Sequence, residues 1–263
     1  MVSSGSAPPS PARTMGARCY LGFYPIIPSI RRVINLAPRG GNGYNGRMDI
    51  VYMDKRILVA VKPAGVLSTD EPGGMPPLLR QEIGDEAACV RTVHRLDAAV
   101  GGLMVFARSA RAAAILSEQM RNGGFHKEYL AVVHGLPEPE HGELRDLLQY
   151  DGARRMNRVV SAPGKGVQEA VLDYERLGEA NGLSLVRVRL HTGRTHQIRV
   201  QFSARGWPLA GDRKYGQGFF DRFPIALWSA HLAFTHPESG KTMDFSLPPP
   251  DAAPWTQFGS VTI

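Results

Sequence analysis

Short segments in which apolar and polar residues alternate follow one another from Met48 onward, and this period of two predicts β-strands. Residues 50–52 and 57–61 are separated by turn-forming residues, so they predict a hairpin. Residues 171–177 and 183–190 alternate around an Asn-Gly pair, which is typical of a tight hairpin turn. Further strands are predicted at residues 103–107, 129–133, 227–234 and 242–247.

Two segments repeat apolar residues at spacings of three and four, which predicts amphipathic helices. Residues 110–121 follow Ser109, a favourable N-cap residue, and are followed by Gly123, a favourable helix stop. Residues 195–205 show the same periodicity and end before Gly206.

The composition of the chain changes near Met48. Residues 1–47 contain 13 glycines or prolines, which predicts a disordered extension. An organelle targeting segment and an upstream start-site extension both fit it. Residues 48–263 predict a single α+β domain on a mixed, largely antiparallel sheet with flanking helices, because the strands are joined by hairpins and the helices are few.

The formal charge of +7 lies mostly in the extension, which has six arginines and no acidic residue. The net charge of the domain therefore gives little support for nucleic-acid binding. Locally, residues 187–214 hold seven basic residues and one acid, Asp212, a pattern more often found on a solvated surface. With only Cys19 and Cys89, no disulfide framework is expected, and a reducing, cytoplasmic setting is the default. The apolar stretch at residues 21–30 is too short to span a membrane.

Several familiar sites are excluded by their spacing. The eight histidines show no standard zinc spacing, so no metal is expected. The end of a phosphate-binding loop is present at Gly240-Lys241-Thr242, but Thr235 replaces its first glycine. No Gly-x-Ser-x-Gly elbow for a serine hydrolase occurs.

Three polar clusters remain in otherwise apolar surroundings, at residues 92–97, 126–133 and 190–200. Taken alone, Asp97 in a glycine-containing loop is typical of a residue that caps a turn. Tyr129 is typical of a core aromatic residue whose hydroxyl is hydrogen-bonded. The third cluster sits at a helix entry, where free backbone N–H groups favour anions.

At these clusters the sequence resembles the RluA-like family of RNA pseudouridine synthases, over roughly residues 49–247. Five blocks occur in the family's order, which is strong evidence, whereas a single block would be weak evidence. They are Leu58-Val59-Ala60-Val61-Lys62-Pro63-Ala64-Gly65, His94-Arg95-Leu96-Asp97, Lys127-Glu128-Tyr129, Thr192-Gly193-Arg194-Thr195-His196-Gln197-Ile198-Arg199 and Pro208-Leu209-Ala210-Gly211-Asp212-Arg213-Lys214-Tyr215-Gly216.

The resemblance implies a pseudouridine synthase fold and the conversion of a uridine in structured rRNA or tRNA to pseudouridine, without cofactor. Asp97 matches the catalytic aspartate, Arg194 the arginine that pairs with it, and Tyr129 the tyrosine that stacks on the target base and is a candidate for taking the C5 proton. Arg95 matches the arginine that fills the space left by the flipped nucleotide. The remaining expected RNA-contact residues are His196, Arg199, Arg205 and Lys214, with Arg199 alternatively packing on the helix surface.

One departure concerns the loop after Asp97. Where the family usually has Thr-Ser-Gly, this chain has Val100-Gly101-Gly102, which loses two hydroxyls. The alternative to an enzyme is therefore a catalytically inactive RNA-binding protein on the same fold. A glycoside hydrolase ranks last, because no second carboxylate is evident. RNA is the expected partner, and no obligatory protein partner is evident.

Overall fold

The computed structural model describes residue 1, residues 32–33 and residues 48–259. The expected disorder of the extension therefore falls almost wholly outside the described residues. Within the extension the structure describes Arg32–Val33, a short strand, β1, which pairs in parallel with Phe245 and Ser246.

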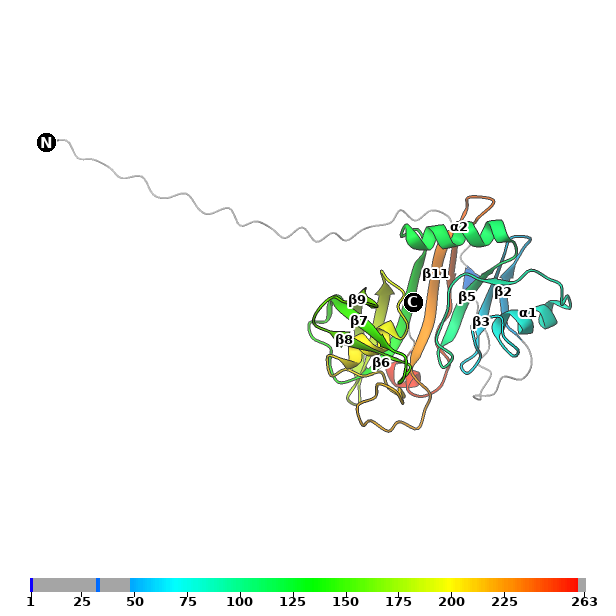
Figure 1. The fold of residues 1–263 in the computed structure, drawn as a ribbon. Coiled ribbons are helices and arrows are strands. Elements are labelled where there is room, and N and C mark those ends of the chain that lie inside the picture. The colour runs from blue at the N-terminus through cyan, green and yellow to red at the C-terminus, as the bar shows by residue number, and fades with distance from the viewer. Residues whose placement is uncertain (2–31, 34–47, 260–263) are drawn as a thin grey trace.

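Twelve strands form one sheet (Figure 1). They are β1 (Arg32–Val33), β2 (Ile50–Met53), β3 (Ile57–Lys62), β4 (Arg91–Thr92), β5 (Gly101–Ala107), β6 (His126–His134), β7 (His141–Asp151), β8 (Met156–Val160), β9 (Val167–Ala180), β10 (Leu183–Leu190), β11 (Leu227–Thr235) and β12 (Thr242–Ser246). The main path runs β2-β3-β5-β11-β6-β10-β9-β7-β8, with β12 beside β11 and β4 beside β5. Only the β5–β11 and β1–β12 pairings among these are parallel, so the predicted fold class is confirmed.

Both predicted hairpins form. β2 pairs antiparallel with β3, and β9 pairs antiparallel with β10 across the turn at Asn181 and Gly182. Both turn residues have positive φ, 53° and 75°, which an Asn-Gly pair adopts readily and which matches the twist of the two strands.

The helices are α1 (Met75–Ile83), α2 (Ala110–Arg121), α3 (Gln197–Ser203) and the 3₁₀ turn η1 (Trp255–Phe258). In α2 the Ser109 hydroxyl accepts from the Ala112 N–H at 3.1 Å, as its N-cap position predicts. α3 is shorter than predicted because His196, at φ 54°, cannot continue a helix in the N-terminal direction. Figure 1 shows α2 lying across one end of the central strands, with β7, β8 and β9 on one side of the molecule and α1 on the other.

Helix α1 and strands β7 and β8 were not predicted. Helix α1 contains two consecutive prolines, Pro76 and Pro77, which lower helix propensity but are tolerated in the first turn. Strand β7 alternates weakly between buried and exposed positions, since Leu144 and Leu148 are its only fully buried residues.

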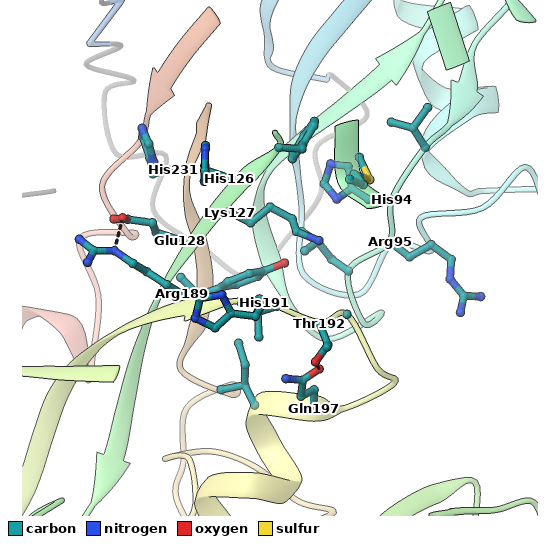
Figure 2. Close-up of a pocket in the computed structure, with 18 of the residues that line it drawn as sticks. His94, Arg95, His126, Lys127, Glu128, Arg189, His191, Thr192, Gln197 and His231 are labelled. Carbon is teal, nitrogen blue, oxygen red and sulfur yellow. Dashed lines mark hydrogen bonds and ion pairs between the residues drawn. The ribbon is translucent and has the colours of Figure 1, made fainter. Parts of the chain in front are cut away.

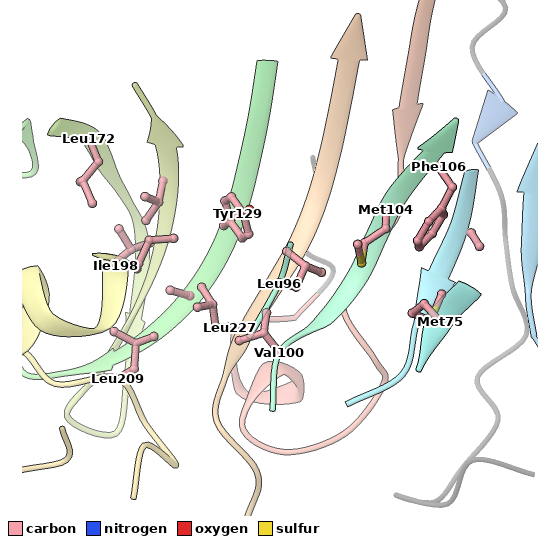
Figure 3. Packing of buried hydrophobic residues seen from close by; sticks show 14 of the residues in the cluster. Met75, Leu96, Val100, Met104, Phe106, Tyr129, Leu172, Ile198, Leu209 and Leu227 are labelled. Carbon is pink, nitrogen blue, oxygen red and sulfur yellow. The ribbon is translucent and has the colours of Figure 1, made fainter. Parts of the chain in front are cut away.

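The largest hydrophobic cluster crosses the sheet from α1 to α3. It contains Met75 and Phe106 toward one side, and Leu172, Ile198 and Phe202 toward the other. Figure 3 shows Tyr129, Leu96, Val100 and Leu227 in the middle of this cluster. The segment that bears Asp97 is thus fixed on both flanks by buried side chains.

Candidate active site

A cavity of about 1920 Å³ lies over the middle of the sheet. Its walls come from the segment between β4 and β5, the start of β6, the segment between β10 and α3, and parts of β11 and β12 (Figure 2). Six of the eight sequence-predicted site residues line it: Arg95, Asp97, Tyr129, Arg194, His196 and Arg199.

The backbone around Asp97 is anchored by buried hydrogen bonds. The Ser68 hydroxyl donates to the Leu96 carbonyl at 2.8 Å and accepts from the Leu96 N–H at 3.0 Å. On the other side, the ammonium of the fully buried Lys62 donates to the Ala98 carbonyl at 2.9 Å. Burial lowers the pKa of Lys62 to about 8. The carboxylate is therefore carried by a fixed backbone, which a reaction at a defined atom requires.

Asp97 is bound by Arg199, one turn into α3. Arg199 Nη1 donates to Asp97 Oδ2 at 3.0 Å. The other edge of the same guanidinium is held by Asp212 through two bonds, Nε to Oδ2 at 2.7 Å and Nη2 to Oδ1 at 2.8 Å. Hydrogen bonds to Arg199 and to backbone N–H groups hold the pKa of Asp212 below its usual value despite desolvation.

The arginine expected to pair with Asp97 was Arg194, and the structure corrects this. Arg194 Nε donates to the Glu169 carbonyl on β9 at 2.9 Å. Arg194 lies before α3, in a segment whose backbone is fixed by Gln197, so its guanidinium leaves toward β9. Arg199, expected at RNA phosphate or on the helix surface, is 6% exposed and occupied by two carboxylates.

His196 faces Asp97 from the start of α3, with Nε2 at 3.9 Å from Asp97 Oδ2. Its Nδ1 lies 3.0 Å from the Tyr215 hydroxyl, which accepts from the Asn157 N–H at 2.8 Å. The Tyr215 hydroxyl therefore holds the imidazole at Nδ1, and Nε2 is the ring nitrogen that faces Asp97. Desolvation is the main cause that lowers the pKa of His196, so the ring is neutral at pH 7.

Tyr129 lies on β6, where its side chain is 5% exposed and its ring packs in the main cluster (Figure 3). Burial, and secondarily the negative charge of Asp97, raise the pKa of its hydroxyl. The hydroxyl is therefore protonated at neutral pH, which disfavours direct acceptance of a proton and favours a stacking role for the ring.

His94 supports the Asp97 segment from within the core. Its Nε2 accepts from the Val105 N–H on β5 at 3.2 Å, as expected of a histidine that holds its loop by hydrogen bonding. Full burial, and then the charge of Lys127, lower its pKa to about 3. The ring is accordingly neutral.

Lys127 was not singled out from the sequence beyond its family block. Figure 2 shows its side chain reaching from β6 across the cavity toward the segment of His94 and Arg95. Burial lowers the pKa of its ammonium. A lysine at the start of an expected strand gives no signal of this, because alternation alone does not say which face carries a cavity.

The other three expected RNA-contact residues lie apart from Asp97's carboxylate. Arg95 is exposed and extends away from Lys127 (Figure 2). Arg205 is engaged by Asp146, at 2.9 and 3.3 Å, and lines neither cavity. Lys214 is exposed and lines a second cavity of about 510 Å³ that also contains Asp97 and Arg199.

The unusual Gly101-Gly102 pair is matched by its neighbours on β11. A Cβ on Gly101 would lie 2.6 Å from the Trp228 ring, and a Cβ on Gly102, at φ 117°, would lie 2.4 Å from the Ser229 carbonyl oxygen. Both glycines therefore allow β5 to approach β11 in their parallel pairing. A side chain at position 101 would meet the Trp228 ring.

Within residues 48–259, no three histidine, cysteine or acidic side chains are grouped as a metal site would require. No helix in the described part of the chain has the length and apolarity needed to cross a membrane.

Comparison with known proteins gives a consistent picture. Residues 56–204 match the family described as RNA pseudouridylate synthase. The dual-specificity RNA pseudouridine synthase RluA of Vibrio vulnificus is 37% identical over 201 residues, covering 73% of this chain and 79% of that protein. The ribosomal large subunit pseudouridine synthase D of Zymomonas mobilis is 32% identical over 217 residues, covering 75% and 68%. The fold is similar to that of human RNA pseudouridylate synthase domain containing 1, with a TM-score of 0.67, 24% identity and coverage of 80% and 86%.

Proposed function

Because this chain belongs to the RluA family of RNA pseudouridine synthases, we propose that it isomerises specific uridines of structured rRNA or tRNA through the Asp97 carboxylate. The enzyme is an isomerase, so the base that leaves the ribose must be the base that returns to it. The bond from C1′ to N1 breaks, the uracil turns within the site, a bond from C1′ to C5 forms, and the C5 proton is lost while N1 gains one.

The observation that carries the proposal is the chain of contacts Asp212–Arg199–Asp97. Attack at C1′ and removal of a proton at C2′ both need an anionic oxygen at a defined place. Asp212 fixes the guanidinium in its plane, and Arg199 then holds one oxygen of Asp97, leaving the other oxygen, Oδ1, without a bond to it.

The other groups act on the nucleotide. The Tyr129 ring stacks on the uracil after its release and keeps it in the cavity while it turns. His196, neutral and with Nε2 facing Asp97, contacts the substrate beside the carboxylate. Arg95, exposed and extending away from Lys127, fills the space left when the nucleotide is extruded.

The altered loop gives no reason to favour an inactive RNA-binding protein. Gly101 complements Trp228, and the carboxylate, its arginine and the buried tyrosine are all in place. The replacement of the family's usual Thr-Ser by Val100-Gly101 therefore changes side-chain packing beside the site.

The test compares the native protein with Asp97→Asn on total RNA from cells that lack the gene. Mapping pseudouridine after incubation should show new modified positions with the native protein and none with Asp97→Asn. RNA affinity should stay within about tenfold, because only the anion is removed. Asp173→Asn is the matched control, since Asp173 also lines the cavity but is held by His191 at its edge. Full modification by Asp97→Asn would refute the assignment.

A further inference from the structure

The loop at residues 216–224 holds an aromatic side chain in solvent. Phe220 is 94% exposed. Its neighbour Phe219 stacks on His134, with ring centroids 3.7 Å apart and planes inclined by 13°. Residues 222–224 of the same loop line the second cavity, the one that reaches Asp97 and Arg199. Single exposed apolar side chains are common on protein surfaces, so the informative feature of Phe220 is its place in a loop that borders this cavity.

Phe220 is not exposed because its loop is loosely held. Beyond Phe220, Asp221 Oδ2 accepts from the Gly211 N–H at 2.7 Å and contacts His134 Nε2 at 2.8 Å. Before it, Gln217 Nε2 donates to the Ser203 hydroxyl at 2.9 Å. The backbone is therefore anchored on both sides of Phe220, and the ring is presented at a fixed place.

Besides Arg199, three cations line the cavity beside this loop: Arg213, Lys214 and Arg222. All three are exposed. Within residues 48–259, no carboxylate is paired with Arg213 or Arg222, whereas the acids of the cavity, Asp97 and Asp212, are both held by Arg199. The rim consequently has positive charge available for an anionic ligand.

We propose that Phe220 is a stacking platform for an unpaired base of the substrate RNA near the target uridine, and that Arg213, Lys214 and Arg222 bind the phosphates between the two nucleotides. The proposal rests on the proposed function and specifies its substrate. An aromatic side chain interleaved with cations is the arrangement that binds single-stranded nucleic acid, because every base offers a ring face. The enzyme would thereby select uridines that have an unpaired neighbour.

The test uses two fluorescently labelled probes, a 12-nucleotide oligouridylate and an RNA duplex of 12 base pairs, in anisotropy titrations. Phe220→Ala should weaken binding of the oligouridylate about tenfold or more and leave the duplex nearly unchanged. Phe220→Tyr should restore binding and Phe220→Leu should not, because stacking needs a planar ring. Tyr150→Ala is the matched control, an aromatic on β7 that is 50% exposed and lines neither cavity. It should leave both affinities unchanged.

The phosphate contacts are tested by salt dependence. Arg222→Ala should lower the slope of log affinity against log salt for the oligouridylate by about 0.7. An unchanged slope, or an oligouridylate affinity that Phe220→Ala leaves intact, would overturn the proposal. So would full rescue by Phe220→Leu, or a concentration-dependent dimer that Phe220→Ala abolishes, since either would assign the ring to apolar contact.

The two proposals fail separately. Pseudouridine formation by Asp97→Asn would refute the catalytic assignment and say nothing of Phe220. Native-like oligouridylate binding by Phe220→Ala, with pseudouridine formation intact and Asp97→Asn inactive, would refute only the stacking platform.

Discussion

Arg199 lies between two carboxylates and binds each with a different edge, Asp212 through Nε and Nη2 and Asp97 through Nη1 at 3.0 Å. The bidentate pair is buried, since the Asp212 side chain is fully buried and that of Arg199 nearly so. The Asp97 carboxylate is thus positioned by an ion pair that lies inside the protein.

Arg199→Lys should lower the single-turnover rate of pseudouridine formation at least tenfold, about 1.4 kcal/mol of barrier. A lysine keeps the charge but cannot bridge two carboxylates with a planar fork. Arg194→Lys is the comparison, because Arg194 binds a carbonyl of β9 and not Asp97. Its rate at saturating RNA should stay within a few fold, and the reverse order of the two variants would return Arg194 to the site.

Asp212→Asn should reduce the rate at saturating RNA with little change in RNA affinity, since Arg199 loses the partner that fixes its plane. It should also lower the free energy of unfolding, by about 3–5 kcal/mol, because a buried cation loses half of its compensation. Rates are therefore measured well below the melting transition. Asp146→Asn breaks the Arg205 ion pair outside both cavities, and should lower stability while leaving the rate unchanged.

Gly101→Ser should lower the free energy of unfolding by about 1–3 kcal/mol, because its Cβ would overlap the Trp228 ring at 2.6 Å. Trp228→Leu should remove this overlap. The double variant should therefore lose less free energy of unfolding than the two single variants lose together. Denaturant titrations measure this coupling. Gly178→Ser is the control, because nothing lies within 4 Å of a Cβ there. Simple additivity at positions 101 and 228 would show that Trp228 does not account for the glycine.

Stability should depend on pH through His94. Its pKa in the folded protein is about 3, below the ordinary value of 6.5, so between these pH values the unfolded chain binds a proton that the folded protein does not. Lowering the pH through this window therefore stabilises the unfolded state, by at most about 1.4 kcal/mol per pH unit. Relative to His94→Gln, the native protein should lose unfolding free energy from pH 6.5 downward. Parallel curves for the two proteins would contradict the burial of a neutral ring.

The sequence predicts much of the fold because several elements carry local signals. The Asn181-Gly182 turn and the Ser109 cap each specify a backbone conformation that the structure adopts. Helix α1 was missed because its two prolines oppose the helical pattern, although the first turn tolerates them. Strand β7 was missed because it has little burial to produce alternation.

The site was predicted less completely, because spacing along the chain does not state where a side chain points. Arg194 and Arg199 lie five residues apart in one block, and only the start of α3 at Gln197 decides that the second faces Asp97. Asp212 carried a usable signal, since it is the single acid in a basic run and a buried arginine needs a partner. Phe220 carried none, because exposure is a property of the folded loop.

The parallel pairing of β5 with β11 has a consequence for synthesis on the ribosome. The segment bearing Asp97 leads into β5, whose Gly101 and Gly102 pair with Trp228 and Ser229, well over a hundred residues later. Arg199 and Asp212 also emerge long after Asp97. A nascent chain thus carries its carboxylate without the partners that fix it until Arg199 and Asp212 have been made, and contacts of this sequence separation form late. We expect activity toward RNA to arise only once β11 has left the exit tunnel.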